Sequence, residues 1–141
     1  MIINDAAGLR RILENHKIIA MVGISPKEDR PSNGVARFLM AHGYTVIPVN
    51  PGQSEILGQR CYPSLEDIPV KVDMVDVFRK AEDVPPVAAA AIAIGAKSLW
   101  LQLGIVNEEA AALASAAGLD VVMDRCPKIE YPRLFALNGK P

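Results

Sequence analysis

The sequence has little of several residue types on which common protein chemistries depend. Its 141 residues include two cysteines, two histidines and one tryptophan, and its aromatic content is 5%. The formal net charge is −1, so the excess of positive charge typical of nucleic-acid-binding proteins is missing. No apolar run approaches the roughly 20 residues that cross a bilayer, and the N-terminus lacks a signal-peptide pattern. We therefore expect a cytoplasmic protein that binds neither nucleic acid nor membrane.

The scarce cysteines and histidines also argue against a metal centre or a nucleophilic enzyme. Cys61 and Cys126 form no CxxC or Cys/His cluster, which favours reduced thiols over a disulfide. His16 and His42 each end a predicted helix, where we expect solvated side chains rather than metal ligands. No GxSxG elbow is present, and Ser25 has no histidine nearby in the sequence. We expect no catalytic residue and no metal.

What the sequence does contain is an alternation of short apolar strands with helices. The predicted strands cover residues 18–22, 44–49, 72–78, 98–103 and 120–123. The predicted helices cover about 5–16, 34–42, 85–94 and 107–117, the last of them capped by Asn107, with short helical pieces at 65–68 and in the C-terminal tail before a loose end. This pattern is typical of a parallel sheet with helices on both faces and right-handed crossovers. We predict a Rossmann-like, doubly wound, three-layer α/β/α fold of about five strands, in a single domain over residues 1–141 with a core of about 17–134.

The first predicted strand leads into a loop suited to an anion. Residues 17–36, KIIAMVGISPKEDRPSNGVA, indicate a buried strand that ends at Gly23, a polar loop, and a helix that opens at Gly34. Unpaired N–H groups and the positive end of the helix dipole meet there, so phosphate is a natural occupant. A tight turn without a ligand is the alternative interpretation.

The same segment departs from the dinucleotide fingerprint. Its turn is Gly23-Ile24-Ser25 rather than GxGxxG. The second strand ends in Asn50-Pro51, where NAD enzymes of this architecture place an acid that binds the ribose hydroxyls. Both departures count against NAD, so an NAD(P)-binding oxidoreductase-like protein is an alternative.

Positive charge gathers in the loops that should form the ligand crevice. In a doubly wound sheet that crevice lies outside the carboxyl ends of the strands, which here means the loops 23–33, 50–52, 78–83, 102–105 and 124–128. Cations in these loops include Lys27, Arg30, Arg79, Lys80 and Arg125. They indicate a ligand that carries several phosphates, although ordinary solvated charge would give the same pattern.

Several further expectations concern burial. Asp73 and Asp76 interrupt the third strand, and we expect them at solvent-facing or strand-edge positions. Cys61 should lie in a surface loop, whereas Cys126 should be a semi-buried thiol in a ligand-facing loop. We expect Trp100 to be buried.

Five segments carry a family resemblance. In chain order they are VGISPKEDRPSNGVARFLMAHGYTVIPVNP, LGQRCYPSLEDIP, VDMVDVFRK, LWLQLGIVNEEA and MDRCPKIEYPRL. Together they resemble the small stand-alone CoA-binding protein family, whose fold is similar to the CoA-binding N-terminal domain of succinyl-CoA synthetase alpha subunits. The resemblance covers about residues 17–134.

The resemblance implies that coenzyme A, or an acyl-CoA, binds at the strand ends. It assigns the adenosine portion to the turn at 50–51 and the pantetheine arm to walls at 102–104 and 125–127. With the loop cations, the candidate ligand-binding residues are Gly23, Ile24, Ser25, Lys27, Arg30, Pro31, Ser32, Asn50, Pro51, Phe78, Arg79, Lys80, Gln102, Leu103, Gly104, Arg125 and Cys126.

The sequence favours a binding protein over an enzyme. Succinyl-CoA synthetases add a second domain with a phosphorylated histidine and a partner subunit that supplies nucleotide activation. This chain ends at Pro141, and neither of its histidines lies in a phosphohistidine-like context. We therefore expect a non-catalytic CoA- or acyl-CoA-binding protein, with a CoA mixed disulfide at Cys126 as a further hypothesis. A ligand-free interaction module is another alternative, and the sequence names no protein partner.

Overall fold

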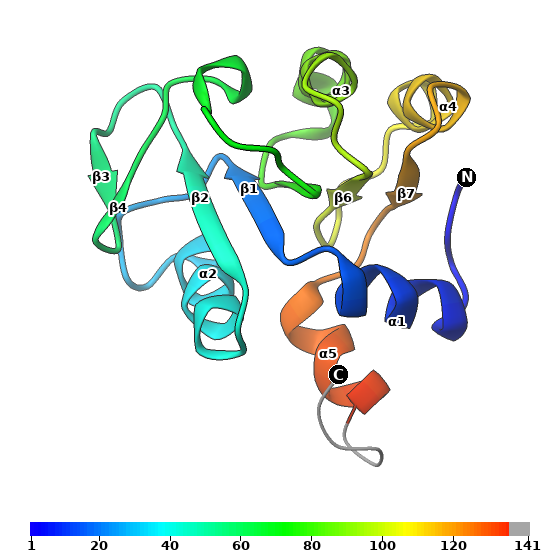
Figure 1. The fold of residues 1–141 in the computed structure, drawn as a ribbon, viewed down its shortest axis with the longest axis horizontal. Coiled ribbons are helices and arrows are strands. Elements are labelled where there is room, and N and C mark those ends of the chain that lie inside the picture. The colour runs from blue at the N-terminus through cyan, green and yellow to red at the C-terminus, as the bar shows by residue number, and fades with distance from the viewer. Residues whose placement is uncertain (136–141) are drawn as a thin grey trace.

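A five-stranded parallel sheet forms the centre of the computed structural model, which describes residues 1–135 (Figure 1). The strand order β2-β1-β5-β6-β7 reverses direction between β1 and β5, as in other doubly wound sheets. The strands are β1 (Ile18–Val22), β2 (Thr45–Val49), β5 (Met74–Val77), β6 (Ser98–Leu101) and β7 (Asp120–Val122). The predicted Rossmann-like α/β fold is confirmed. The loose end expected for the tail lies outside the described residues.

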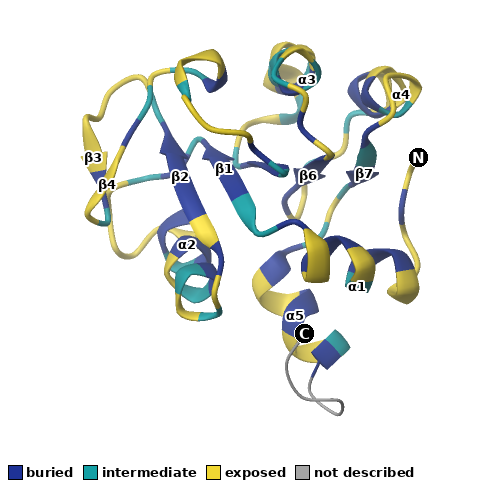
Figure 2. Cartoon of the chain, viewed as in Figure 1, coloured by how far each residue is buried: buried dark blue, intermediate teal, exposed yellow. Residues whose placement is uncertain are grey.

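Helices cover both faces of this sheet (Figure 1). On one face lie α1 (Ala6–Asn15), α2 (Pro31–Ala41) and α5 (Pro127–Phe135), and on the other lie α3 (Val84–Ala93) and α4 (Glu108–Ala116). Short 3-10 turns, η1 (Leu65–Asp67) and η2 (Ala81–Asp83), lie in the connections around β5. Figure 2 shows the strands as mostly buried and the outer helix faces as exposed. The sheet is therefore the middle layer of three.

Two apolar clusters, one on each face of the sheet, form the core. Successive residues of a strand point to opposite faces, so Met74 joins the cluster under α1, α2 and α5, whereas Val75 joins the cluster under α3 and α4. Trp100 is fully buried in the first cluster, as predicted. Because both faces are covered, the strands are almost continuously apolar.

Several helix boundaries follow from local signals in the sequence. Helix α2 begins at Pro31 rather than at Gly34, because proline fixes a backbone angle that suits the first helical position. Gly43 ends it in a left-handed conformation, with φ of 89°. The predicted cap on α4 is confirmed, since the Asn107 side chain accepts a hydrogen bond from Ala110 N at 2.9 Å.

The segment after β2 contains a small hairpin where we expected only a loop. Its strands are β3 (Glu55–Ile56) and β4 (Gln59–Arg60), joined by Leu57 and Gly58, which both have positive φ. Leu-Gly is an unusual pair for such a turn, which Asn-Gly more often makes, so the local signal was weak. The returning chain pairs with the end of β2, and Cys61 is buried rather than on the surface as expected.

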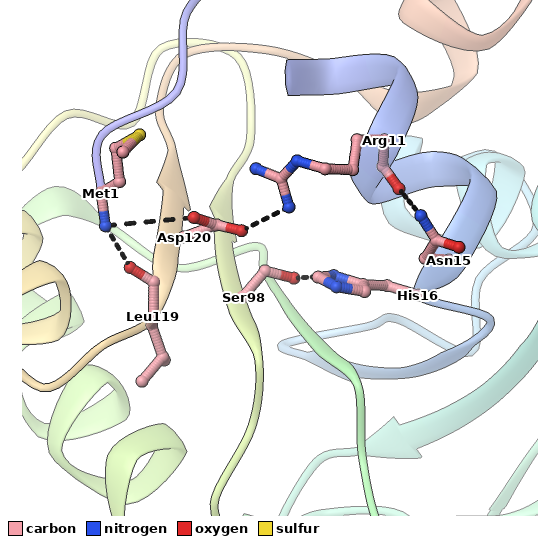
Figure 3. Close-up of polar contacts among 7 residues, drawn as sticks. All are labelled: Met1, Arg11, Asn15, His16, Ser98, Leu119 and Asp120. Carbon is pink, nitrogen blue, oxygen red and sulfur yellow. Dashed lines mark hydrogen bonds and ion pairs between the residues drawn. The ribbon is translucent and has the colours of Figure 1, made fainter. Parts of the chain in front are cut away.

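The expectation that His16 is solvated was wrong. The chain runs directly from α1 into β1, and this places His16 beside Ser98 at the start of β6, where only 6% of the histidine is exposed. Its Nδ1 lies 2.9 Å from Ser98 Oγ (Figure 3). Burial lowers the pKa of His16 below its ordinary value.

Asp73, which precedes β5, and Asp76, which lies in β5, differ in environment. Asp73 lies at the amino edge of the sheet, as expected, where it accepts a hydrogen bond from Ile18 N at 3.0 Å and pairs with Lys97 at 3.6 Å. Asp76, however, is fully buried, which contradicts the expectation of an exposed position. It lies in register between Met21 and Trp100 on a face covered by helices, and burial raises its pKa well above the usual value.

Candidate functional site

The carboxyl edge of the sheet brings the predicted ligand loops together. At the point where the strand order reverses, the turn after β1 lies directly against the turn after β5. Gly23 has a φ of 86°, and a methyl group added to it would lie 2.3 Å from the carbonyl oxygen of Phe78. The Gly23 N–H also donates to Val49 O at 3.0 Å. Glycine is therefore required here by both backbone conformation and space.

Side chains of neighbouring elements hold the loop between β1 and α2 in place. Ser32 Oγ accepts a hydrogen bond from Ser25 N at 2.9 Å, and Asn33 Nδ2 donates to Ser25 O at 3.0 Å. From the next loop, Asn50 Nδ2 donates to Ile24 O at 2.9 Å. Ser32 and Asn33 are both buried in the first turn of α2. The loop is thus held in place by hydrogen bonds from within the chain.

An apolar cavity opens beside this loop, on the face of the sheet covered by α3. Its volume is about 230 Å³, and its walls include Val22 and Val49 at the ends of β1 and β2, Leu65 from η1, and Val87 from α3. The exposed Arg79 side chain also lines it. The cavity can receive an apolar group, and its charged lining consists of Arg79 with the acids Glu66 and Asp83.

A second cavity, of about 540 Å³, lies between the first turns of α2 and α5. Its positively charged lining consists of Arg30, Arg37 and Lys128, opposed by Glu28 and Asp29. The N-termini of two helices border this cavity, so their dipoles add to its positive potential.

Two residues of this second cavity bear on the sequence predictions. Cys126 lines it beside Arg30 and Pro31, so the structure brings these three predicted residues together. Lys128 also lines this cavity but was not among the residues predicted from the sequence. Its Nζ lies 4.0 Å from where a side chain on Gly34 would begin, and its only signal in the sequence was its place at the end of a predicted crevice loop.

Comparison with known proteins identifies the family. A family model described as "CoA binding domain" matches residues 17–132. This chain belongs to the CoA-binding domain family. The resemblance inferred from the sequence is confirmed, and the matched range is close to the core expected at 17–134.

Relatives of this CoA-binding domain occur both as small proteins and as parts of larger enzymes. The chain is 40% identical over 125 residues to the uncharacterized protein YneT of Bacillus subtilis, covering 89% of this chain and 93% of YneT. A solved structure of a hypothetical protein from Pyrococcus horikoshii superposes with a TM-score of 0.90 at 44% identity, covering 93% of this chain and 92% of that one. An ADP-forming acetate–CoA ligase of Archaeoglobus fulgidus is 31% identical over an alignment of 120 residues, and the match covers 78% of this chain but 18% of the ligase.

Other predicted residues of the CoA-binding domain lie in varied surroundings. Lys27, Pro51, Lys80, Leu103 and Gly104 are exposed at the carboxyl edge. Gln102, in contrast, is buried with its carboxamide against Asp76. In the amide orientation that satisfies both groups, in which the carboxamide oxygen and nitrogen are exchanged, the Gln102 nitrogen donates to the two Asp76 oxygens at 2.9 and 3.3 Å.

Arg125 is already engaged by other groups of the chain. Its guanidinium donates to Asn4 Oδ1 at 2.7 Å and lies 3.4 Å from Glu130. Its guanidinium is therefore held by contacts within the chain, although the Glu130 carboxylate also pairs with Arg133 at 3.6 Å. Arg125 lines a third cavity rather than either of the two described above.

Residues 1–135 show neither a metal-binding cluster nor a membrane-crossing helix. No group of three or more His, Cys, Asp or Glu side chains in this range is placed to hold a metal ion. Within the same range, no helix has the length and apolar character needed to traverse a bilayer.

Proposed function

We propose that this protein is a single CoA-binding domain that binds coenzyme A or an acyl-CoA at the carboxyl edge of its sheet. The observation that carries the proposal is the loop between β1 and α2. Hydrogen bonds with Ser32, Asn33 and Asn50 hold it in place, and it lies where doubly wound proteins bind nucleotides. Membership of the CoA-binding domain family supplies the identity of the ligand.

Each part of the ligand has a matching surface. The phosphates would lie at the first turn of α2, near Ser25, Lys27 and Arg30, because a helix N-terminus and guanidinium groups favour anions. The adenine ring suits the apolar cavity of about 230 Å³, with Arg79 beside it. The pantetheine arm would then follow the loop at 102–104, away from the phosphates.

The proposed role is binding without catalysis, in the cytoplasm. The aligned region is 18% of the acetate–CoA ligase that it resembles, so the remainder of that enzyme has no counterpart in the aligned part of this chain. Cys61 and Cys126 are both free thiols, which suits a reducing compartment. Incubation of the protein with acetyl-CoA, with and without ADP and phosphate, should leave the thioester intact. An assay for released CoA thiol checks this expectation.

Calorimetric titration tests the identity of the ligand. CoA should bind more tightly than NAD or ADP, and Arg79→Ala should weaken CoA binding by about tenfold or more, because a hydrogen bond to a charged group contributes about 1.5–3 kcal/mol. Lys71→Ala is the matched control, since it removes an exposed cation just before β5, at the amino edge. Absence of CoA binding, or tighter binding of NAD, would overturn the proposal.

A further inference from the structure

A third cavity, of about 440 Å³, lies at the carboxyl ends of β6 and β7 and takes no part in the site proposed above. The N-terminal segment forms one wall, since Ile3 N donates to Val121 O at 2.8 Å and so holds the segment along β7. The other walls come from the loop before α4, which contributes Val106, and from the loop after β7, which contributes Met123.

Apolar and polar groups line this cavity in about equal measure, and several of the apolar side chains reach solvent. Ile2 and Val106 line it and are 47% and 45% exposed, and Leu103, in the same loop as Val106, is 55% exposed. Large, solvent-exposed apolar side chains that cluster around a cavity often mark a binding site for an apolar group.

The charged groups of the cavity disfavour an anionic occupant. Glu108 and Asp124 both line it. The one cation of the lining, Arg125, is engaged by Asn4 and Glu130. A carboxylate brought into this space would meet two acids without a free positive partner, so an uncharged group is favoured.

The third cavity adjoins the proposed CoA site, because the consecutive residues Arg125 and Cys126 line one cavity each. Cys126 lines the cavity beside the first turn of α2, where the phosphates would lie, and Arg125 lines the third cavity. The loop at 102–104 lies alongside, because Gly104 N donates to Asp124 Oδ1 at 2.7 Å. A pantetheine arm that follows this loop would bring its thiol end toward the third cavity.

We propose that this third cavity holds the uncharged acyl group of a short-chain acyl-CoA, an inference that rests on the proposed function. The protein would then distinguish apolar acyl-CoA thioesters from free CoA and from thioesters of dicarboxylic acids.

Titrations with CoA and with acetyl-, butyryl-, hexanoyl- and succinyl-CoA test this inference. Affinity should rise along the uncharged series, by up to about fourfold for each methylene group that enters the cavity, since burial of one CH₂ contributes about 0.8 kcal/mol. Succinyl-CoA should bind no more tightly than CoA. Equal affinities for CoA and butyryl-CoA would overturn the inference while leaving the proposed function intact, whereas a failure of every ligand to bind would overturn both.

A pair of variants localises the acyl group. Val106→Asp adds a carboxylate to the cavity wall at an exposed position, so it should abolish the gain from butyryl and hexanoyl groups and leave the affinity for CoA within about twofold. Leu113→Asp, on the exposed face of α4, is the matched control and should keep the full gain. An unchanged gain in Val106→Asp would overturn the inference. A change in oligomeric state alone, seen for Val106→Asp in size-exclusion chromatography, would also overturn it, because the patch would then be a contact between copies.

Discussion

Gly23 and Phe78 are in contact across the point where the sheet reverses its strand order. The space between them is so small that a methyl group on Gly23 would lie 2.3 Å from the Phe78 carbonyl oxygen. The two loops that border the proposed CoA site therefore fit together only because residue 23 has no side chain.

Replacing Gly23 by alanine should damage both stability and binding. The positive φ alone should cost about 1–2 kcal/mol, and the clash with Phe78 O adds to it by forcing the two loops apart. Gly43→Ala is the control, because Gly43 has a similar φ of 89° and nothing within 4 Å of the added atom. Urea unfolding and CoA titration should show a larger loss of stability for Gly23→Ala, and a loss of affinity in that variant alone. Equal effects of the two substitutions would refute this account.

Ser32→Ala should weaken CoA binding by loosening the loop after β1. The substitution leaves Ser25 N without the acceptor that now lies 2.9 Å away, which should cost about 1 kcal/mol of stability and several-fold in CoA affinity. Ser115→Ala, on α4, is the serine-to-alanine control. If calorimetry gave the same CoA affinity for wild type and Ser32→Ala, this hydrogen bond would have no part in ordering the site.

Asp76→Asn should make the protein more stable at neutral pH. Burial raises the pKa of Asp76 in the folded state, so the folded protein binds more protons than the unfolded chain above the ordinary carboxyl pKa. The free energy of unfolding therefore falls as pH rises from about 4. Asparagine cannot ionise and still offers an oxygen to Gln102. Urea unfolding between pH 4 and 8 should show a growing advantage of Asp76→Asn, and Asp29→Asn, an exposed control, should show none. A constant difference between Asp76→Asn and wild type would contradict the prediction.

His16 should make the protein less stable below neutral pH. Burial lowers its pKa in the folded state, so the unfolded chain binds the additional proton first. The free energy of unfolding should therefore fall as pH decreases from about 6.5, the ordinary histidine value, through the lowered pKa. His16→Asn should be less stable at pH 8, because Ser98 loses its partner, yet should lose less stability than wild type between pH 7 and 5. A slope unchanged by His16→Asn would show that another group is responsible.

The sequence alone determined the five strands of the main sheet, the approximate positions of its helices and the edge at which their loops gather. The bounds of β1 were predicted as observed, and the cap at Asn107 lies where it was expected. These features depend on local signals, namely apolar runs, capping residues and glycine turns, which act over a few neighbouring residues. Parallel strands then bring their carboxyl ends to one edge, so the loops of the candidate site could be named in advance.

Only the tertiary structure decided which polar side chains within those elements are buried, paired or free. His16 meets Ser98 across 82 positions of the chain, and Arg125 meets Asn4 across 121. No local pattern encodes such contacts, because they depend on how helices and strands far apart in sequence pack against one another. The same packing buries Asp76 in the sheet, removes Arg125 from the free cations, and creates the cavity beside Val106 from three segments that the sequence keeps apart.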